Sequence, residues 1–324
     1  MTADGRRRIG VVLAVSRGRV NADELLAHDP LLDTVDVGDA DGAPILGVED
    51  AEVLVGNPSE QRFAEIAGRM PRLRWFHATS AGVDRFEPTL ARRPGVWMTR
   101  TSGHALPMAE FVLATIFAIA KRLPEVRDAQ RRHSWESGRA GEELLEIEGR
   151  SVCIVGLGSI GQEVARLVTG FGMRVTGVRR HAAPHRYAAR VLPPDRLAEA
   201  IQGADHVVLA CPLTEKTRGL IDARALASMG ERAWLINVAR GAVVEEDDLF
   251  HVLSQRLIGG AALDTMWVEP VPASSRWYGL DNVIIRPHRA ASSYGARARL
   301  VAQVVDGLRR YRAGQPLSSL TAAP

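Results

Sequence analysis

Short apolar runs alternate with amphipathic stretches along the first hundred residues. The runs show no polar alternation, which is typical of strands buried on both faces of a parallel sheet. We expect such strands at 9–15, 51–57, 73–80 and 95–100. Helical spacing follows Asn21 and Ser59, whose side chains can cap a first turn, and predicts helices at 21–30 and 59–70. This order of elements is typical of an α/β layer domain.

The remainder of the chain repeats the same kind of pattern. Six further apolar runs, mostly separated by helical stretches, predict a second parallel sheet with crossover helices. These runs are 151–156, 174–178, 206–211, 233–238, 259–264 and 282–287. Longer helices are expected at 107–122, 125–136 and 295–314. The sequence therefore predicts an α/β fold with two doubly wound parallel-sheet domains, Rossmann-like or flavodoxin-like.

Composition narrows the class of protein. A chain of 324 residues with 46% hydrophobic and 24% charged residues is long enough for two soluble domains. The formal charge is only +3 and no basic stripe with interleaved aromatic residues occurs, so we expect no nucleic acid partner. The longest apolar segment, 109–120, falls far short of the ~20 residues that cross a bilayer, so we expect no membrane association.

The N-terminal segment and the two cysteines both favour a cytoplasmic location for the protein. Residues 6–15 place arginines before an apolar run, as a signal peptide does, but no small-residue cleavage site follows and a first buried strand is the better interpretation. Cys153 and Cys211 lie far apart inside apolar runs, without metal-ligand spacing. We therefore expect a cytoplasmic protein with two reduced core cysteines and no metal site.

A glycine-rich turn follows the first strand expected in the second half of the chain. Gly156 suits a tight turn, Gly158 the close approach of a pyrophosphate, and Gly161 the close packing of a helix on a sheet. The N–H groups at the start of that helix, around Ser159 and Ile160, would then meet the phosphates. In this strand–turn–helix context the glycines predict a dinucleotide site.

The end of the next strand bears on which dinucleotide binds. A domain that prefers NAD usually has a carboxylate there, which accepts hydrogen bonds from the adenosine ribose. This chain has Arg179 and Arg180 instead, and a guanidinium pairs well with a 2′-phosphate. We therefore expect a preference for NADP(H), with use of NAD(H) left open. Two solvated surface arginines are the alternative interpretation.

Four polar residues follow later strands of the same half. They are Arg240, Asp264, Glu269 and His288. Open α/β sheets bind their ligands at the carboxyl ends of the strands, so these residues are candidates for the reaction chemistry.

With these motifs in order, the sequence resembles the D-isomer-specific 2-hydroxyacid dehydrogenase family over almost its whole length. The matching motifs are SAGVD (80–84), MAEFVLA (108–114), GLGSIG (156–161), CPLTEKTRGLI (211–221), NVARG (237–241), ALDTMWVEP (262–270) and PH (287–288). The resemblance implies an NAD(P)-dependent oxidoreductase with a dinucleotide-binding domain (104–288) inserted into a discontinuous substrate domain (1–103 plus 289–324). It also implies an active site in the cleft between the lobes and a homodimer formed through the helices near 104–136.

The resemblance and the chemistry of the residues lead to the same roles. Arg240 would hold the carboxylate and carbonyl of a 2-oxo acid with its planar fork. His288 would donate a proton to the oxygen on reduction, while Glu269 would fix the tautomer and favour the protonated imidazole. The N–H groups expected to seat the substrate carboxylate are those of Ala81, Gly82 and Val83.

The resemblance also implies which residues contact the cofactor. Asp264 is expected at the nicotinamide end, and Met108 on the long helix is expected to pack there too. The other implied contacts are Cys211, Pro212, Thr217, Val238, Ala239, Ala290, Arg240 and His288.

The leading hypothesis is an NADPH-dependent reductase of a small 2-oxo acid, such as glyoxylate or hydroxypyruvate, giving the D-2-hydroxy acid. Oxidation of formate or phosphite on the same scaffold is a rival, but Glu269 argues against formate and the arginine pair against an NAD-reducing role. A nucleotide-sensing, corepressor-like protein is a third hypothesis, although no added docking segment occurs. Arg289 and Trp267 depart from the family pattern and leave the natural substrate open.

Overall fold

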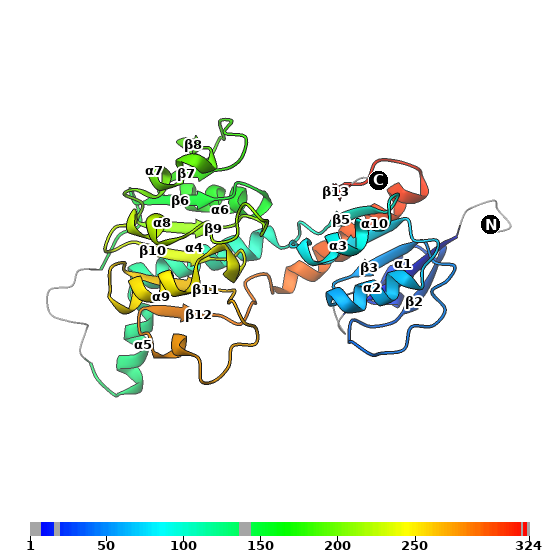
Figure 1. The fold of residues 1–324 in the computed structure, drawn as a ribbon, viewed down its shortest axis with the longest axis horizontal. Coiled ribbons are helices and arrows are strands. Elements are labelled where there is room, and N and C mark those ends of the chain that lie inside the picture. Colours follow the sequence, from blue (N-terminus) through cyan, green and yellow to red (C-terminus); the bar gives the residue numbers. More distant parts are fainter. Residues whose placement is uncertain (1–7, 16–19, 136–143, 319, 323–324) are drawn as a thin grey trace. The chain divides into compact units, whose positions relative to one another are not determined.

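The chain folds into two compact α/β units (Figure 1). The computed structural model describes residues 8–15, 20–135, 144–318 and 320–322. Unit 1 comprises Met1–His104 and Ser292–Pro324, and unit 2 comprises Ala105–Ala291. Each unit has a sheet of its own with apolar side chains packed on both faces, so the predicted fold class is confirmed.

Unit 1 contains a six-stranded sheet in the order β13-β5-β4-β3-β1-β2. Its strands are β1 (Ile9–Ala14), β2 (Leu32–Asp36), β3 (Val53–Gly56), β4 (Trp75–Ala78), β5 (Trp97–Arg100) and β13 (Leu320–Ala322). The first five pair in parallel, in the flavodoxin-like order 2-1-3-4-5, and β13 pairs antiparallel with β5. Four of the parallel strands were predicted, whereas β2 and β13 were not.

Helices cover both faces of this sheet. They are α1 (Ala22–His28), α2 (Glu60–Gly68), the short α3 (Glu87–Leu90) and α10 (Tyr294–Arg312). The predicted caps are confirmed, because the Asn21 side chain accepts from the N–H of Glu24 and the Ser59 side chain from that of Arg62. Each cap satisfies an N–H that the helix itself leaves unpaired.

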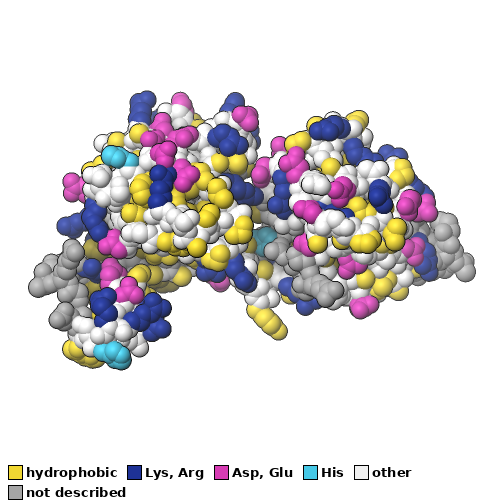
Figure 2. Space-filling model, turned by 60° about the horizontal axis from the view of Figure 1, so that its bottom comes forward, with side chains coloured by type: hydrophobic (Ala, Val, Ile, Leu, Met, Phe, Trp, Pro, Cys, Tyr) yellow, Lys and Arg dark blue, Asp and Glu magenta, His cyan; other side chains and the backbone are white. Residues whose placement is uncertain are grey.

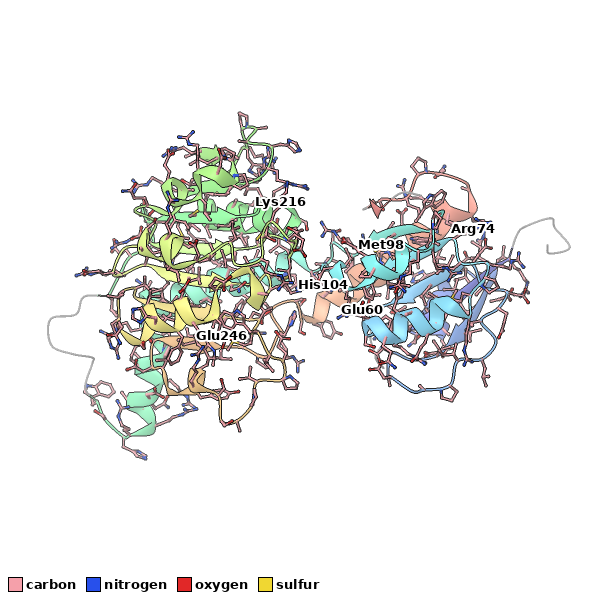
Figure 3. All side chains as sticks on the ribbon, viewed as in Figure 1. Glu60, Arg74, Met98, His104, Lys216 and Glu246 are labelled. Atoms are coloured by element: carbon pink, nitrogen blue, oxygen red, sulfur yellow. The ribbon has the colours of Figure 1, made fainter. Side chains whose placement is uncertain are left out.

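The core of unit 1 has aromatic side chains on both faces of the sheet. Phe63, Phe76 and Phe86 pack with ring centroids 4.5–4.9 Å apart on one face. On the other face Trp75 packs with apolar residues of α10. Met98 on β5, labelled in Figure 3, is 1% exposed. His77 is also buried in this unit, and burial lowers its pKa to about 4.

Unit 2 contains a seven-stranded sheet in the order β12-β11-β10-β9-β6-β7-β8. The strands are β6 (Ser151–Val155), β7 (Arg174–Val178), β8 (Arg190–Leu192), β9 (His206–Leu209), β10 (Trp234–Asn237), β11 (Gly260–Leu263) and β12 (Val283–Ile285). All of these pairings are parallel. The strand order reverses between β6 and β9, which is where doubly wound sheets bind dinucleotides.

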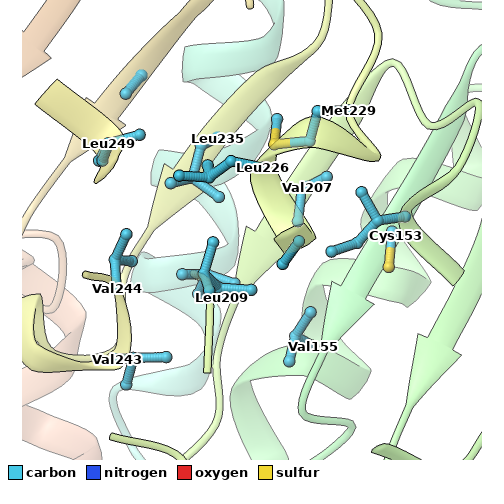
Figure 4. Packing of buried hydrophobic residues seen from close by; sticks show 14 of the residues in the cluster. Cys153, Val155, Val207, Leu209, Leu226, Met229, Leu235, Val243, Val244 and Leu249 are labelled. Carbon is cyan, nitrogen blue, oxygen red and sulfur yellow. The ribbon is translucent and has the colours of Figure 1, made fainter. Parts of the chain in front are cut away.

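The helices of unit 2 pack on both faces of that sheet. They are α4 (Ala105–Ala120), α5 (Leu123–Arg131), α6 (Ser159–Gly170), α7 (Leu197–Ile201), α8 (Ala223–Ala227) and α9 (Glu246–Ser254). The helix predicted at 125–136 ends at Arg131, and Glu136 lies outside the described residues. Figure 4 shows one face, where Leu226 and Leu249 pack with Val207, Leu209 and Leu235 of the sheet.

Several polar and sulfur-containing side chains are buried in unit 2. Cys153 and Cys211 are buried free thiols, and burial raises their pKa values to about 12 and about 11. His206 on β9 is 6% exposed, and its pKa is lowered to about 4, mainly by burial. The high pKa values keep both thiols protonated and unreactive near neutral pH.

The surface mixes the two signs of charge. On the face shown in Figure 2, Lys and Arg side chains are interspersed with Asp and Glu. Within the described ranges, none of the helices combines the length and the apolar character that crossing a bilayer requires.

Candidate active site

The predicted dinucleotide turn lies where the strand order of unit 2 reverses. Gly156 follows β6 with φ +104°, a backbone conformation that L side chains rarely adopt. A Cβ at this position would lie 2.6 Å from the backbone nitrogen of Cys211, which follows β9. Only glycine therefore lets the exits of these two adjacent strands approach so closely.

The next two glycines shape the start of α6. A Cβ on Gly161 would lie 1.9 Å from the carbonyl oxygen of Gly156, so the helix can begin directly against the turn only with glycine here. Gly158 is the N-cap residue, and no side chain caps the helix. The N–H groups of Ser159, Ile160 and Gly161 are thus open to an external acceptor, as a phosphate-binding helix start requires.

The two arginines after β7 differ in what they contact. Arg179 is half-buried, and its Nη2 donates to the carbonyl of Ala183 at 2.8 Å. Arg180 is exposed, and among the described residues it has no hydrogen-bond or ion-pair partner. The guanidinium of Arg179 therefore holds the loop after β7, whereas that of Arg180 is the one available to a ligand.

The remaining predicted cofactor residues line the neighbouring strand exits or the core. Thr217 donates to the carbonyl of Pro212 at 2.6 Å, which closes the loop that follows Cys211. Val238 and Ala239 are buried directly after β10. Met108 and Ala290 belong to the apolar cluster between α4, α6 and the sheet. Of these predicted residues, Cys211 approaches the glycine turn most directly, through its backbone beside Gly156.

Arg240 leaves β10 in a turn that is fixed from both sides. The Asn237 side chain donates to the carbonyl of Arg240 and accepts from the N–H of Ala239, at 3.0 and 2.9 Å. A Cβ on the following Gly241 would lie 2.4 Å from the carbonyl carbon of Met266. The Arg240 turn therefore packs directly on the loop that leads to Glu269. Gly241 is the last residue of the NVARG motif, and its role in this close packing is visible only in the structure.

Glu269 and His288 form a bonded pair. The Nδ1 atom of His288 lies 2.8 Å from Oε2 of Glu269, and the other carboxylate oxygen accepts from the N–H of Met266 at 2.9 Å. Both side chains are partly open, with 47% of the His288 and 38% of the Glu269 side chain exposed. The carboxylate thus orients Nδ1 of the ring, while Nε2 stays available to a substrate.

Asp264 organises the turn that carries His288. Asp264 is 2% exposed, and its carboxylate accepts from the N–H groups of Arg289 and Ala290 at 2.8 and 2.9 Å. The backbone carbonyl of Asp264 accepts from the N–H group of His288. These bonds hold His288 at φ +48°, in the left-handed region. Burial raises the pKa of Asp264, and the two N–H donors oppose this shift. The pairing of Arg286 with Asp264, at 3.7 Å, was not predicted.

The predicted substrate loop lies in unit 1, between β4 and a short turn at Asp84–Phe86. Within the described ranges, the N–H groups of Ala81, Gly82 and Val83 donate to no protein acceptor. The carbonyls of this loop are paired: that of Ala81 accepts from Arg100 Nη1 at 2.9 Å and that of Gly82 from Ser80 Oγ at 2.7 Å. Successive open N–H groups form an anion-binding concavity.

The two residues that depart from the resemblance have ordinary packing contacts. Trp267 stacks on Trp277 with ring centroids 5.1 Å apart, and its Nε1 donates to the carbonyl of Val244. Both indoles line a cavity of about 270 Å³ in unit 2. Arg289 is exposed, and its carbonyl accepts from Arg286.

Comparisons with known proteins agree on one family. Residues 113–290 match the family described as D-isomer specific 2-hydroxyacid dehydrogenase, NAD binding domain. A glyoxylate reductase from Korarchaeum cryptofilum (strain OPF8) is 32% identical over 274 residues, covering 83% of this chain and 82% of that protein. One from Thermococcus gammatolerans is 34% identical over 277 residues, with the same two coverages.

A solved structure extends this similarity to the fold of the whole chain. It is a D-isomer specific 2-hydroxyacid dehydrogenase from Xanthobacter autotrophicus Py2, in complex with NADPH and MES. The two chains are 29% identical with a TM-score of 0.83, and the match covers 97% of this chain and 98% of the other.

Proposed function

The chain belongs to the D-isomer-specific 2-hydroxyacid dehydrogenase family, and we propose that it is an NADPH-preferring reductase of glyoxylate or hydroxypyruvate. It is an oxidoreductase whose family acts on small 2-oxo and 2-hydroxy acids. The observation that carries the proposal is the 2.8 Å pair of His288 and Glu269, which follow β12 and β11. β11 is also the neighbour of β10, the strand that leads to Arg240.

In the proposed reaction, His288 is the proton donor. Glu269 holds Nδ1, so Nε2 carries the proton that passes to the substrate oxygen as the carbonyl is reduced. Arg240 binds the carboxylate and carbonyl of the 2-oxo acid through its planar guanidinium. The N–H groups of Ala81, Gly82 and Val83 are the donors proposed for a substrate carboxylate in unit 1. The product is the D-2-hydroxy acid.

The residues around the glycine turn fit a dinucleotide. Side chains at Gly156 and Gly161 would occupy space that the close turn requires, and the uncapped start of α6 offers N–H donors to a pyrophosphate. Bound there, the cofactor supplies the hydride for the reduction. Unit 2 is therefore proposed as the dinucleotide-binding domain and unit 1 as the substrate domain.

The proposed preference for NADPH depends on Arg180. Its exposed guanidinium, without a protein partner among the described residues, suits a 2′-phosphate. Arg179 supports the loop through Ala183. The NADPH found in the Xanthobacter relative is in line with this preference.

A panel of substrates with both cofactors tests the proposal. Purified protein is mixed with NADPH or NADH and with glyoxylate, hydroxypyruvate or larger 2-oxo acids, and nicotinamide absorbance is followed. We expect turnover of a small 2-oxo acid with a lower Michaelis constant for NADPH. Reverse assays with formate and phosphite are the control, and turnover of either would replace the proposed substrate. Tight nucleotide binding without any turnover would favour a sensor.

The assembly and location are proposed as a cytoplasmic homodimer. Leu123 and Val126 on α5 are more than half exposed, and Trp135 beyond that helix is 99% exposed. Large exposed apolar side chains on and beside one helix favour burial of that helix against a partner. Light scattering on the purified chain is expected to give twice the monomer mass.

A further inference from the structure

We propose that Arg100 is a positioning residue that aims the anion-binding N–H groups of the substrate loop, with Ser80 as a weaker second tether. The inference rests on the proposed function, because it takes the N–H groups of Gly82 and Val83 as donors to the carboxylate of a 2-oxo acid. It concerns unit 1 alone. Neither Arg100 nor Ser80 is required to touch the substrate.

Arg100 reaches the loop because of sheet register. It is the last residue of β5 and lies opposite Ala78, the last residue of β4, in the parallel pairing. The chain leaving β4 enters the substrate loop three residues later, and Arg100 Nη1 donates to the carbonyl of Ala81 at 2.9 Å. The backbone of Arg100 is itself held by Gln303 of α10, whose Nε2 donates to the Arg100 carbonyl at 3.3 Å.

The bond from Arg100 to the carbonyl of Ala81 also fixes the direction of the next N–H group, because the peptide group is planar. In a trans peptide the C=O and the next N–H point in opposite directions. Because Arg100 holds the carbonyl of Ala81, the N–H of Gly82 points away from the guanidinium. Ser80 Oγ donates to the carbonyl of Gly82 at 2.7 Å, so the N–H of Val83 is directed in the same manner. Two successive donors are thus fixed by tethers on their own peptide planes.

The charge of Arg100 strengthens the effect. Over the ranges that the structure describes, no carboxylate lies within ion-pair distance of this guanidinium, so its charge is not neutralised by a side chain. A cation bonded to the carbonyl polarises the peptide and makes its N–H a better donor. Arg100 therefore both aims the loop and adds positive potential at the site of the substrate carboxylate.

A direct role would give a different pattern across substrates. If Arg100 instead bound a second, distal anionic group, its removal would affect dicarboxylic 2-oxo acids and spare glyoxylate, which has no distal group. As a positioning residue it acts on the carboxylate that all 2-oxo acids share. Its removal is then expected to weaken every substrate by the same factor, including glyoxylate.

The test compares Arg100→Met with the wild type on glyoxylate, hydroxypyruvate and oxaloacetate. We expect the Michaelis constant to rise about 10-fold or more for each acid, as loss of a charged hydrogen bond implies. Turnover at saturation and the dissociation constant of NADPH are expected to stay within about 2-fold, because carboxylate binding is shared by ground and transition states. Arg100→Lys is expected to recover part of the loss.

Two further variants separate the positioning role from a loss of folding stability and test the second tether. Arg93→Met removes another arginine of unit 1 that donates to backbone carbonyls, those of Ala67 and Met70, and is expected to lower stability without changing the Michaelis constants. Ser80→Ala is expected to raise the Michaelis constant for glyoxylate by about 2- to 10-fold, the range for one neutral hydrogen bond.

Either of two results would overturn the inference. One is an unchanged Michaelis constant for glyoxylate in Arg100→Met, and the other is a rise confined to oxaloacetate. Both leave the proposed function standing, since the wild-type enzyme would still reduce the acids. A wild-type enzyme that reduces none of them would instead refute the proposed function itself.

Discussion

The two units offer their ligands different parts of the polypeptide at the same end of a parallel sheet. In unit 2 the groups that follow the strands are side chains: Arg240 after β10, Glu269 after β11 and His288 after β12. In unit 1 they are main-chain N–H groups after β4, and the side chains of Ser80 and Arg100 bond to carbonyls of that loop. Proton transfer needs a titratable side chain, whereas seating a carboxylate needs only aligned donors.

The difference shows where each unit is sensitive to substitution. In the proposed function, chemistry in unit 2 depends on the identity of three side chains and on Asp264, which holds the turn that carries His288. Binding in unit 1 depends on the direction of peptide planes and so on residues that do not face the ligand. Substitutions in the two units should therefore separate into effects on turnover and effects on substrate affinity.

The strongest contrast is expected from the proton donor of unit 2. His288→Asn removes the proposed proton donor and should lower turnover by ~10²–10⁴-fold, the usual worth of a positioned general acid. The Michaelis constant for glyoxylate should change far less. Steady-state kinetics measure both, with NADPH affinity as the control. Near-normal turnover would mean that another group donates the proton. The expected contrast between effects on turnover in unit 2 and on substrate affinity in unit 1 would then be lost.

Each unit contains a buried histidine that should make its stability sensitive to acid. His77 in unit 1 and His206 in unit 2 both have a pKa of about 4 against an ordinary 6.5, so the folded units favour the neutral rings. The contribution of each neutral histidine to the free energy of unfolding is about 3 kcal/mol. It is complete above pH 6.5 and is lost as the pH falls towards 4. His206→Leu should reduce the acid sensitivity of unit 2 only.

Hydrogen exchange followed strand by strand measures this effect. Between pH 7 and 4.5, wild-type β4 and β9 should both lose protection, and in His206→Leu the loss should be smaller in β9 than in β4. His77→Leu is the reciprocal variant, although it also removes the 2.8 Å contact of His77 with Thr99. Equal losses in both variants would show that other groups control acid unfolding.

A smaller effect is expected at the cofactor end of unit 2. Arg180→Ala should raise the Michaelis constant for NADPH about 10-fold, as for one lost charge-assisted bond, and leave that for NADH nearly unchanged. Arg179→Ala should have less effect on the discrimination between cofactors, because that guanidinium already bonds Ala183. Equal losses with NADPH and NADH in Arg180→Ala would contradict recognition of the 2′-phosphate.

Most strands could be predicted because they are buried on both faces and carry long apolar runs. The exceptions lie at sheet edges. β2 has Asp33 and Asp36 within five residues, both exposed, since one side of an edge strand faces solvent. β8 has only three residues, and β13 pairs antiparallel with a strand more than 200 positions earlier. Such short edge strands depend on their partner rather than on a pattern of their own.

The candidate site was predictable to the extent that it uses side chains or glycines. Arg240, Glu269 and His288 stand in motifs, and the roles proposed for them remain predictions. Arg100 carries no such signal, because an arginine at a strand end is common in an arginine-rich chain, and Ser80 stands in the SAGVD motif without an assigned role. Gly241 stands in the NVARG motif, but its need for close packing on Met266 becomes visible only in three dimensions.

The antiparallel pairing of β13 has a practical consequence for anyone who handles this enzyme. Leu320 pairs with Thr99 and Ala322 with Met98, so the last described strand borders β5 immediately beside Arg100. A purification tag or truncation directly after or within β13 would disturb the neighbour of β5, the strand that ends at Arg100. Affinity tags are better carried at the other terminus, and kinetic constants from carboxyl-tagged preparations should be compared with tag-free protein.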